Sequence, residues 1–522
     1  MPQRPLHILW ADDEIELLKP HILFLRGKGY DVTTANNGRD ALAVVSDAGA
    51  DIDLVILDEN MPGLTGLETL SRIKEIAPLL PVIMITKSEE ENIMDQAVGN
   101  KIADYLIKPV NPSQILLSIK KILHSGDLIS RQTTDSYRQQ FPEISDAINC
   151  AASLADWTEI YRRLTRRELE LADSATDMIE MLQLQKNDAN SEFFKHVRRN
   201  YESWLDPDDP DAPLMSHRIM RDRVIPLLRS GEKPFLVVID NFRLDQWEAV
   251  KPLLADFFSF DESLYCSILP TATQYARNAL FSGLMPVEIE RLFPDLWVDE
   301  DSEEGKNLNE SPLIESLLKR FRLDSSVRFT YNKLNDTPAC ETLIRNFNSL
   351  LDADLNVIVI NFIDMLSHAR TESRMIRELA SSNAAYRSLT ESWFRHSAAI
   401  ELFRRMALTG RRVILTTDHG TIRVENPVKV VGDRNTNTAL RYKLGKTLSY
   451  PARQVYEVRD PRRFGLPAPN LSTTYIMAGN RDFFAYPNNY NYYVQYYTGT
   501  FQHGGISLEE MLVPLISLSP KS

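Results

Sequence analysis

The sequence predicts an α/β protein of several domains, in which a small helical bundle separates two α/β domains. Short apolar runs alternate with amphipathic stretches over residues 1–124, as in a parallel sheet with crossover helices. Residues 125–205 carry apolar positions at helical spacing, and the alternation returns over 206–522. The runs expected to be strands are 6–11, 31–35, 53–57, 81–85 and 104–107, and then 235–239, 264–269, 356–361, 412–416, 473–477 and 512–517.

The composition excludes several functional classes. The chain has 522 residues and a net charge of −13, so its general surface repels nucleic acid, and a phosphate-rich ligand needs a local site or metal ions. The three cysteines are far apart, which predicts no disulfide framework. No apolar run is long enough to cross a membrane, so we expect a cytoplasmic protein without membrane insertion.

Acidic and basic residues end the expected strands of the first domain. Asp12 and Asp13 follow the first strand, Asp58 ends the third, Thr86 the fourth and Lys108 the fifth. Because the carboxyl ends of parallel strands meet at one edge, these side chains are expected to form one pocket. Three carboxylates there favour a hard cation such as Mg²⁺. Its expected ligands are Asp12 (through water), Asp13, Asp58 and the backbone carbonyl of Asn60.

This arrangement resembles the receiver domains of response regulators over the whole first domain, which implies a flavodoxin-like fold. The resemblance is carried by Asp12-Asp13, Asp58 with Met61-Pro62-Gly63, Thr86, Tyr105 and Lys108-Pro109. It implies that Asp58 accepts a phosphoryl group from a sensor histidine kinase. It also implies that Thr86 and Tyr105 switch conformation in response, while Lys108 offsets the charge of the phosphoryl group.

A second set of metal-ligand residue types follows strands of the last domain. Asp240, Asp364 and the pair Asp418-His419 each come directly after an apolar run. His368 is four residues after Asp364, so one helical turn brings both side chains to one ion, and His503 lies in a late loop. Carboxylate and imidazole ligands together favour Zn²⁺, with Mn²⁺ as the alternative. We interpret His217 and His396 as structural.

This pattern resembles the alkaline-phosphatase superfamily, and within it the PglZ domain, over about residues 215–520. The resemblance implies an alkaline-phosphatase-like α/β output domain with two Zn²⁺ ions. Asp240, Asp418 and His419 would hold one ion, and Asp364, His368 and His503 the other. Two ions ~3.5–4 Å apart can stabilise both the attacking and the leaving oxygen of a phosphoryl displacement.

The superfamily uses a Ser or Thr nucleophile at a helix N-terminus beside the first metal, and two threonines fit that place. Thr271 lies directly after the strand, while alignment of Ser282-Gly283 with the end of the family's helix favours Thr273. Both threonines therefore stay candidates. A helix N-terminus favours a phosphate anion in either case.

Three further features bear on the substrate. Arg243 could clamp phosphate oxygens or form a salt bridge with Asp245. A basic loop could line the entrance or be a solvated hairpin, and its members are Lys429, Arg434, Arg441, Lys443 and Lys446. Six tyrosines in 486–497 could stack bases, although edge-strand packing is favoured. Together these features favour a phosphodiesterase acting on nucleotides or oligonucleotides.

The order of receiver, helices and PglZ domain resembles PorX-type regulators, which implies a link to type IX secretion in Bacteroidetes. Phosphorylation of Asp58 is then expected to promote a homodimer and to change access to the metal site. The alternative is a signalling scaffold that binds a partner such as a sigma factor, with the output domain as a binding module. A transcription factor is disfavoured because no helix-turn-helix follows the receiver.

Overall fold

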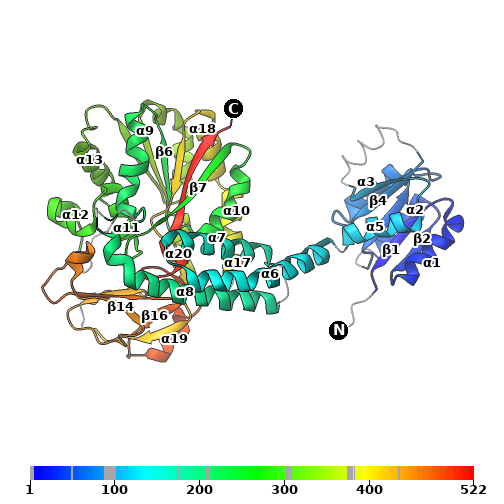
Figure 1. Ribbon diagram of the computed structural model, residues 1–522. Helices are drawn as coiled ribbons and strands as arrows, with labels where there is room; N and C mark the ends of the chain where they lie inside the picture. Colours follow the sequence, from blue (N-terminus) through cyan, green and yellow to red (C-terminus); the bar gives the residue numbers. More distant parts are fainter. Residues whose placement is uncertain are drawn as a thin grey trace. The chain divides into compact units, whose positions relative to one another are not determined.

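The computed structural model describes residues 5–48, 51–87, 102–123, 125–172, 176–206, 209, 212–299, 305, 307–372, 380, 382–432 and 436–521. These residues divide into two compact units, Met1–Ser136 and Tyr137–Ser522, and each is described by itself. In both units, buried apolar strands form a central sheet that helices cover (Figure 1). No helix among the described residues is both long and apolar enough to span a bilayer.

The first unit contains a parallel five-stranded sheet in the order β2-β1-β3-β4-β5. This order is that of the flavodoxin-like fold, which confirms the prediction for the first domain. Strands β3 and β4 are buried throughout, and β1 is buried after His7, because helices cover both faces of the sheet. The elements are β1 (His7–Ala11), α1 (Lys19–Gly27), β2 (Asp31–Ala35), α2 (Gly38–Ala48), β3 (Leu54–Asp58), α3 (Gly66–Ile76), β4 (Val82–Thr86), β5 (Asp104–Ile107) and α5 (Pro112–Leu123).

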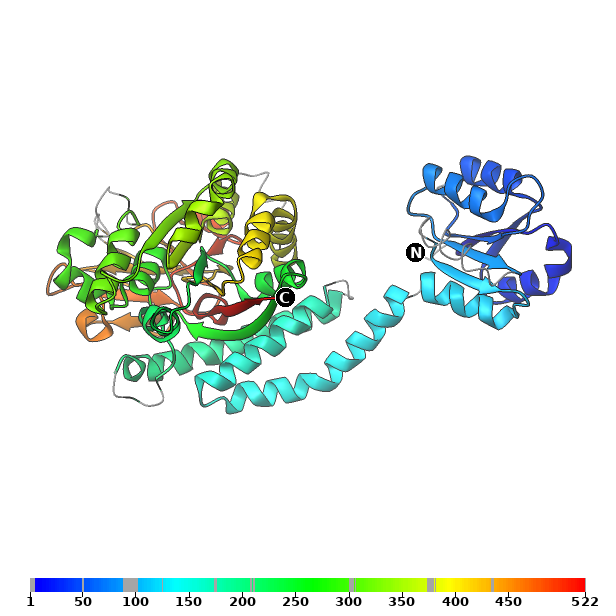
Figure 2. The same ribbon diagram turned by 90° about the horizontal axis from the view of Figure 1, so that it is seen from above.

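Three long helices follow: α6 (Ser125–Cys150), α7 (Leu154–Glu170) and α8 (Thr176–Trp204). A capping box starts α7, in which Ser153 and Asp156 exchange hydrogen bonds. The apolar faces of these helices share one continuous core with the second sheet. From Tyr137 onward these helices therefore belong to the second compact unit, and the division into the domains 1–124, 125–205 and 206–522 stays a prediction. Figure 2 shows α7 and α8 running along the second sheet.

The second unit contains a six-stranded sheet in the order β7-β18-β10-β6-β9-β8. Strands β10, β6, β9 and β8 are parallel, and β18 is antiparallel to both β10 and β7. The strands are β6 (Phe235–Ile239), β7 (Phe258–Cys266), β8 (Phe329–Leu334), β9 (Leu355–Ile360), β10 (Val413–Thr416) and β18 (Leu512–Pro520). The helices are α9 (Ile225–Arg229), α10 (Leu244–Leu254), α11 (Thr273–Ser282), α12 (Pro286–Leu292), α13 (Glu310–Arg320), α14 (Thr337–Arg345), α15 (Phe362–Glu372), α17 (Asn383–His396), α18 (Ala398–Leu408), α19 (Tyr490–Tyr497) and α20 (Leu508–Met511).

Two strand predictions differ from the structure. The strand expected at 264–269 is β7, which begins at Phe258 and ends at Cys266, ahead of Pro270, which has no N–H for a sheet. The strand expected at 473–477 belongs to a separate sheet and not to the central one. The smaller sheets are built from β11 (Ile422–Arg423), β12 (Asn426–Lys429), β13 (Tyr442–Gly445), β14 (Val455–Val458), β15 (Thr474–Ala478), β16 (Asp482–Ala485) and β17 (Phe501–Gln502).

Candidate functional site: an acidic receiver pocket and a six-residue output site

The acidic pocket of the first unit lies at the carboxyl ends of β1 and β3. Asp12, Asp13 and Asp58 each offer a carboxylate oxygen, and these oxygens lie within 4.8 Å of one another. Asp12 and Asp58 are buried, whereas Asp13 is exposed. The three acids that the sequence analysis grouped therefore lie together in the structure, and their spacing suits one divalent cation. Asn60, whose backbone carbonyl is expected to bind the Mg²⁺ ion, is an exposed residue two positions after Asp58.

Lys108 is the cation of this pocket. Its Nζ lies 2.9 Å from Asp12 Oδ2 and 2.8 Å from Asp58 Oδ1. Burial raises the pKa of Asp58, although Lys108 opposes this shift. Thr86 is buried at the end of β4, and Tyr105 is half-buried in β5, the strand beside it. The residues proposed to accept and report a phosphoryl group thus lie on three adjacent strands.

The output unit gathers Asp240, Asp418 and His419 at the ends of β6 and β10, which are neighbouring parallel strands. All three are buried, and each offers a ligand atom within 4.8 Å of the others. His419 Nε2 lies 3.7 Å from Asp418 Oδ2 and 4.0 Å from Asp240 Oδ1. Asp240 Oδ1 is buried and has no hydrogen-bond partner among the described residues, so its lone pairs are available to a cation.

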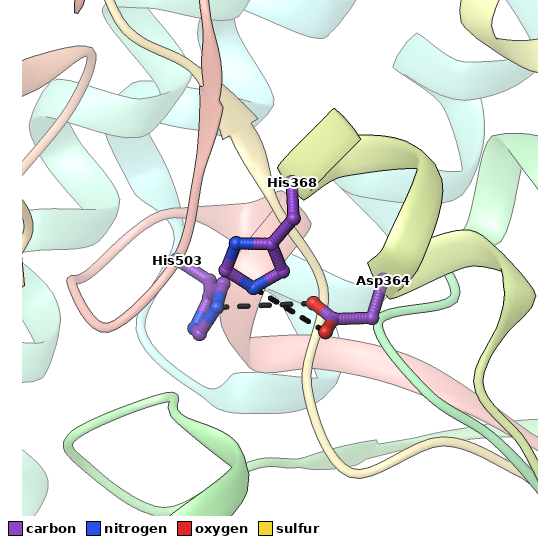
Figure 3. A group of neighbouring side chains, drawn as sticks. All are labelled: Asp364, His368 and His503. Carbon is purple, nitrogen blue, oxygen red and sulfur yellow. Dashed lines mark ion pairs between the residues drawn. The ribbon is translucent and has the colours of Figure 1, made fainter. Parts of the chain in front are cut away.

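A second triad consists of Asp364 and His368 on α15 and His503 in the loop after β17 (Figure 3). The i, i+4 spacing on α15 puts His368 Nε2 3.4 Å from Asp364 Oδ2. His503 Nε2 lies 4.0 Å from Asp364 Oδ1. The surrounding protein desolvates His503 and, together with His419, lowers its pKa to about 3. The ring is therefore neutral at physiological pH, which is the form that binds metals.

Backbone carbonyls orient His419 and His503 in the same way. His419 Nδ1 lies 3.2 Å from the carbonyl of Gly420, and His503 Nδ1 lies 3.2 Å from the carbonyl of Thr271. Because a carbonyl only accepts, the proton in each contact is on Nδ1, which leaves a lone pair on Nε2. Both Nε2 atoms point toward the acids of their triads. The donor set thus fits two divalent ions with mixed imidazole and carboxylate ligands.

The two triads are adjacent. The rings of His419 and His503 stack with centroids 4.3 Å apart. Asn241 connects the triads, because its Nδ2 donates to Asp364 Oδ1 at 3.2 Å and its backbone N donates to Asp418 Oδ1 at 3.4 Å. Its φ of 63° is left-handed, a conformation that Asn tolerates better than most residues. The sequence analysis did not identify Asn241 as a functional residue, although it directly follows Asp240.

The geometry separates the two candidate threonines. Thr273, the first residue of α11, is half-buried, and its Oγ1 lies 3.0 Å from His419 Nε2. Thr271 is fully buried, and its Oγ1 donates to the carbonyl of Gly505 at 2.8 Å and accepts from Gly504 N at 3.1 Å. Thr271 therefore fastens the loop that carries His503, and the hydroxyl of Thr273 faces the metal-ligand residues.

Arg277 is a second residue of this site that the sequence analysis missed. It is 1% exposed, and its guanidinium contacts Asp240, Asp418 Oδ2 at 3.1 Å and Glu310 Oε1 at 3.3 Å. Burial and the nearby carboxylates raise the pKa of Asp240, which Arg277 partly offsets. Arg277 is four residues after Thr273, on the same face of α11. That spacing was the only signal for it in the sequence.

Several substrate predictions fail or change. Arg243 is 2% exposed and forms a bidentate pair with Asp245, with both contacts at 2.8 Å, so the salt-bridge alternative describes this residue. In the basic loop, Arg441 is buried against Glu510 at 2.5 Å and Lys443 is also buried, while Lys429 and Lys446 are exposed and Arg434 lies outside the described residues. Five of the six tyrosines lie on helix α19 and not on an edge strand, and Tyr486 precedes this helix.

Comparisons with known proteins agree with this architecture. The BREX system PglZ alkaline phosphatase-like domain matches residues 219–518, the PorX response regulator linker domain 127–205, and the response regulator receiver domain 8–120. A CpxR homolog of Haemophilus influenzae, a transcriptional regulatory protein, is 32% identical over 31% of this chain and 70% of its own length. The regulator ZraR of Klebsiella oxytoca is 33% identical over 28% of this chain, which spans 33% of that relative.

Among solved structures, the chemotaxis protein CheY4 of Vibrio cholerae is 29% identical over 23% of this chain and 99% of its own, with a TM-score of 0.22. The PglZ match alone covers more than half of the 522 residues. The chain therefore belongs to the PglZ family and is a PorX-type response regulator, with a receiver domain and an alkaline-phosphatase-like output domain.

Proposed function

We propose that this response regulator is phosphorylated on Asp58 by a sensor histidine kinase and that its PglZ domain is a two-zinc phosphodiesterase. The observation that carries the hydrolase proposal is the adjacency of two ligand triads to a helix-initial hydroxyl. Thr273 Oγ1 lies 3.0 Å from His419 Nε2, and the His419 and His503 rings lie 4.3 Å apart. Such a grouping suits displacement at phosphorus, where attacking and leaving oxygens both need nearby positive charge.

In the proposed reaction, Thr273 is the nucleophile. Its oxygen forms a bond to phosphorus while the bond from phosphorus to the leaving oxygen breaks, and water then hydrolyses the threonine ester. Bound divalent ions would supply positive charge that favours loss of the hydroxyl proton and stabilises the developing charge. The N–H groups in the first turn of α11, which begins at Thr273, would favour the same anion. Asn241 keeps the two triads in register through Asp364 and Asp418.

We propose nucleotide or oligonucleotide phosphodiesters as substrates. Support comes from α19, on which Tyr492 is 62% exposed and Tyr493 is 38% exposed. The rings of Tyr492 and Tyr496 stack with centroids 6.0 Å apart, and we propose that a base stacks on the exposed ring of Tyr492. The chain leads from this helix through β17 directly to His503. Arg243 is no longer part of the proposal, because Asp245 engages its guanidinium.

The substrate proposal is tested on the zinc-loaded full-length protein. Linear and cyclic oligonucleotides and bis-p-nitrophenyl phosphate are compared with p-nitrophenyl phosphate. We expect faster turnover of the diesters. A clear preference for the monoester would overturn the phosphodiesterase proposal while leaving phosphohydrolysis in place.

The nucleophile is tested with Thr273→Ala, for which we expect a fall in kcat of about a thousandfold. Thr273→Ser keeps a hydroxyl and is expected to retain activity. Thr271→Ser is the matched control, because serine keeps the bonds to Gly504 and Gly505. Wild-type turnover by Thr273→Ala would eliminate Thr273 as the nucleophile.

For the receiver, we propose Mg²⁺ at Asp12, Asp13, Asp58 and the carbonyl of Asn60, with Thr86 and Tyr105 as the residues that respond. Phosphorylation would promote a homodimer, and the pathway it serves would be the control of type IX secretion, which the PorX linker domain supports. Light scattering after size-exclusion chromatography, with and without beryllofluoride and Mg²⁺, measures the mass. An unchanged mass would contradict the dimer proposal.

A further inference from the structure

A buried network of charged and polar side chains joins α8 to the loops of the output site. It contains three cations and three anions from five elements, so it is electrically balanced. Every member but Glu168 is less than a tenth exposed. The members are Lys186 and Asn190 on α8, Glu168 on α7, Glu509 on α20, Arg387 on α17, and Arg243 with Asp245 at the start of α10.

In this network, two residues of α8 contact α20 directly. Asn190 Nδ2 donates to Glu509 Oε2 at 3.0 Å, and Asn190 Oδ1 accepts from the backbone N of Leu508 at 2.8 Å. Lys186 Nζ lies 3.2 Å from Glu509 Oε1 and 2.5 Å from Glu168 Oε2. Burial alone would lower the pKa of Lys186, but Glu168 and Glu509 raise it, so the lysine stays charged.

From α20 the contacts reach both metal-ligand loops. The carbonyl of Glu510 accepts from Gly420 N at 3.2 Å, next to His419. Glu510 Oε1 accepts from Gly505 N at 2.9 Å, two residues after His503. The fit is close, because a Cβ on Gly420 would lie 2.0 Å from the carbonyl oxygen of Glu509. A shift of α20 therefore moves the backbone beside a ligand of each triad.

A second branch reaches the loop after Asp240. Arg387 Nη1 lies 3.5 Å from Glu168 Oε1 and 3.3 Å from Asp245 Oδ2. Asp245 in turn holds Arg243, which is three residues after Asp240. Both branches start at Lys186, and together they end on loops that carry Asp240, His419 and His503.

The upstream end of the network lies beside α6. Gln185, the neighbour of Lys186, is 1% exposed. Its Oε1 accepts from Tyr137 at 3.0 Å, and its Nε2 donates to the carbonyl of Phe141 at 2.9 Å and to Ser145 at 2.8 Å. Helix α6 begins at Ser125, just after the last helix of the receiver. The helix that leaves the receiver thus contacts α8 one residue from the network.

We propose that Lys186 and Asn190 are positioning residues that set the geometry of both metal triads through Glu509, and that α8 is the element by which α6 affects the output site. This inference rests on the proposed hydrolase function. On this proposal the long helices do more than join two domains, because they also set the geometry of the output site. Neither residue touches a metal ligand, so each acts only through α20 and the network.

The test measures zinc affinity of the full-length protein by chelator competition, together with kcat and KM. We expect Lys186→Met and Asn190→Ala each to weaken zinc binding by about tenfold or more, as loss of residues that orient ligands does. We expect kcat to fall while KM stays within about twofold, because substrate contacts remain. Lys186→Arg keeps the charge and should restore both values. The matched control is Lys195→Ala, an exposed lysine on α8.

A double-mutant cycle separates positioning from general destabilisation. If Lys186 acts through Glu509, Lys186→Met with Glu509→Gln loses no more zinc affinity than Lys186→Met alone. Circular dichroism verifies folding, and Asn190→Ala, which changes no charge, carries the test if Lys186→Met fails to fold. Wild-type zinc affinity in the folded variants, or additive effects in the cycle, would overturn the inference. A wild-type protein that binds zinc but hydrolyses no phosphoester would overturn the proposed function alone, because zinc affinity still decides the positioning role.

Discussion

The receiver pocket and the output site both gather acids at the carboxyl ends of parallel strands, but they balance this charge differently. In the receiver, Lys108 follows the last strand, is 15% exposed and contacts two carboxylates. In the output site, Arg277 comes from inside helix α11, is 1% exposed and contacts three. A cation at an open edge can change partners when the charge on Asp58 changes. A cation enclosed by carboxylates has a fixed position.

This difference fits the two proposed tasks. A receiver has to respond to one added phosphoryl group, so its charges need to be movable. A hydrolase works best with charges fixed in advance, because no reorganisation is then needed during the reaction. In the output site the rigidity comes from the helix interior, from carbonyls behind His419 and His503, and from Asn241 between the triads.

The largest effect is expected when the loss of one carboxylate in the output site is compared with the loss of one in the receiver pocket. Asp240→Asn removes a charged ligand of the first triad, and we expect kcat for bis-p-nitrophenyl phosphate to fall by about a thousandfold. Asp58→Asn removes the proposed phosphorylation site and is expected to leave unphosphorylated turnover within about twofold. The two rates are measured with zinc-loaded full-length protein. Equal losses in both variants would show that the two regions do not have separate tasks.

The second prediction concerns the two cations in metal-free buffer. Arg277→Met leaves buried carboxylates without their partner, and we expect the free energy of unfolding of the output unit to fall by about 3–5 kcal/mol. Lys108→Met opens a site that water can reach, so we expect a loss of about 1 kcal/mol for the receiver. Urea unfolding in EDTA measures both values. An Arg277→Met variant as stable as the wild type would contradict the fixed role of this arginine.

The same contrast explains what the sequence could predict. Every member of the receiver pocket lies at a strand end, so apolar runs located all of them. In the output domain, Asp240, Asp364 and the pair Asp418-His419 were located for the same reason, and His368 by its helical spacing from Asp364. The role of His503, which lies in a loop, was implied only by the resemblance to the PglZ domain. Arg277 lies within a helix, where no strand end marks it. The choice between Thr271 and Thr273 depends on Gly504 and Gly505, more than 230 residues away along the chain.

The helices and the tyrosines show two further limits. The apolar spacing in 125–205 identified one buried face on each helix, but it did not show that the second sheet covers that face. The tyrosines of 490–497 repeat at helical spacing, since Tyr492 stacks on Tyr496 and Tyr493 on Tyr497. That period was present in the sequence, but the strand preference of tyrosine was given more weight.

The two regions are also expected to respond to acid in opposite directions. In the output unit, burial and nearby arginines lower the pKa of His217 to about 4. The unfolded chain therefore binds a proton more tightly, and stability is lost as the pH falls from about 6.5 towards 4. We expect a loss of about 2 kcal/mol between pH 8 and pH 5 that His217→Gln lacks. Urea unfolding of both proteins at the two pH values measures this. The same loss in His217→Gln would assign it to another group.

The smallest effect is expected at Asp58. Because burial raises its pKa, the folded receiver holds this proton more tightly than the unfolded chain does, and stability falls as the pH rises from about 4 through the raised value. In EDTA at pH 7, Asp58→Asn should therefore stabilise the receiver by on the order of 1 kcal/mol, as expected where function costs stability. Lys108 keeps a partner in this variant, because Asp12 Oδ2 lies 2.9 Å away. The gain should disappear near pH 4, and calorimetry at both pH values measures it. A receiver that is destabilised by Asp58→Asn at pH 7 would show that the ion pair with Lys108 outweighs burial, and the pocket would then resemble the output site in holding its charges fixed.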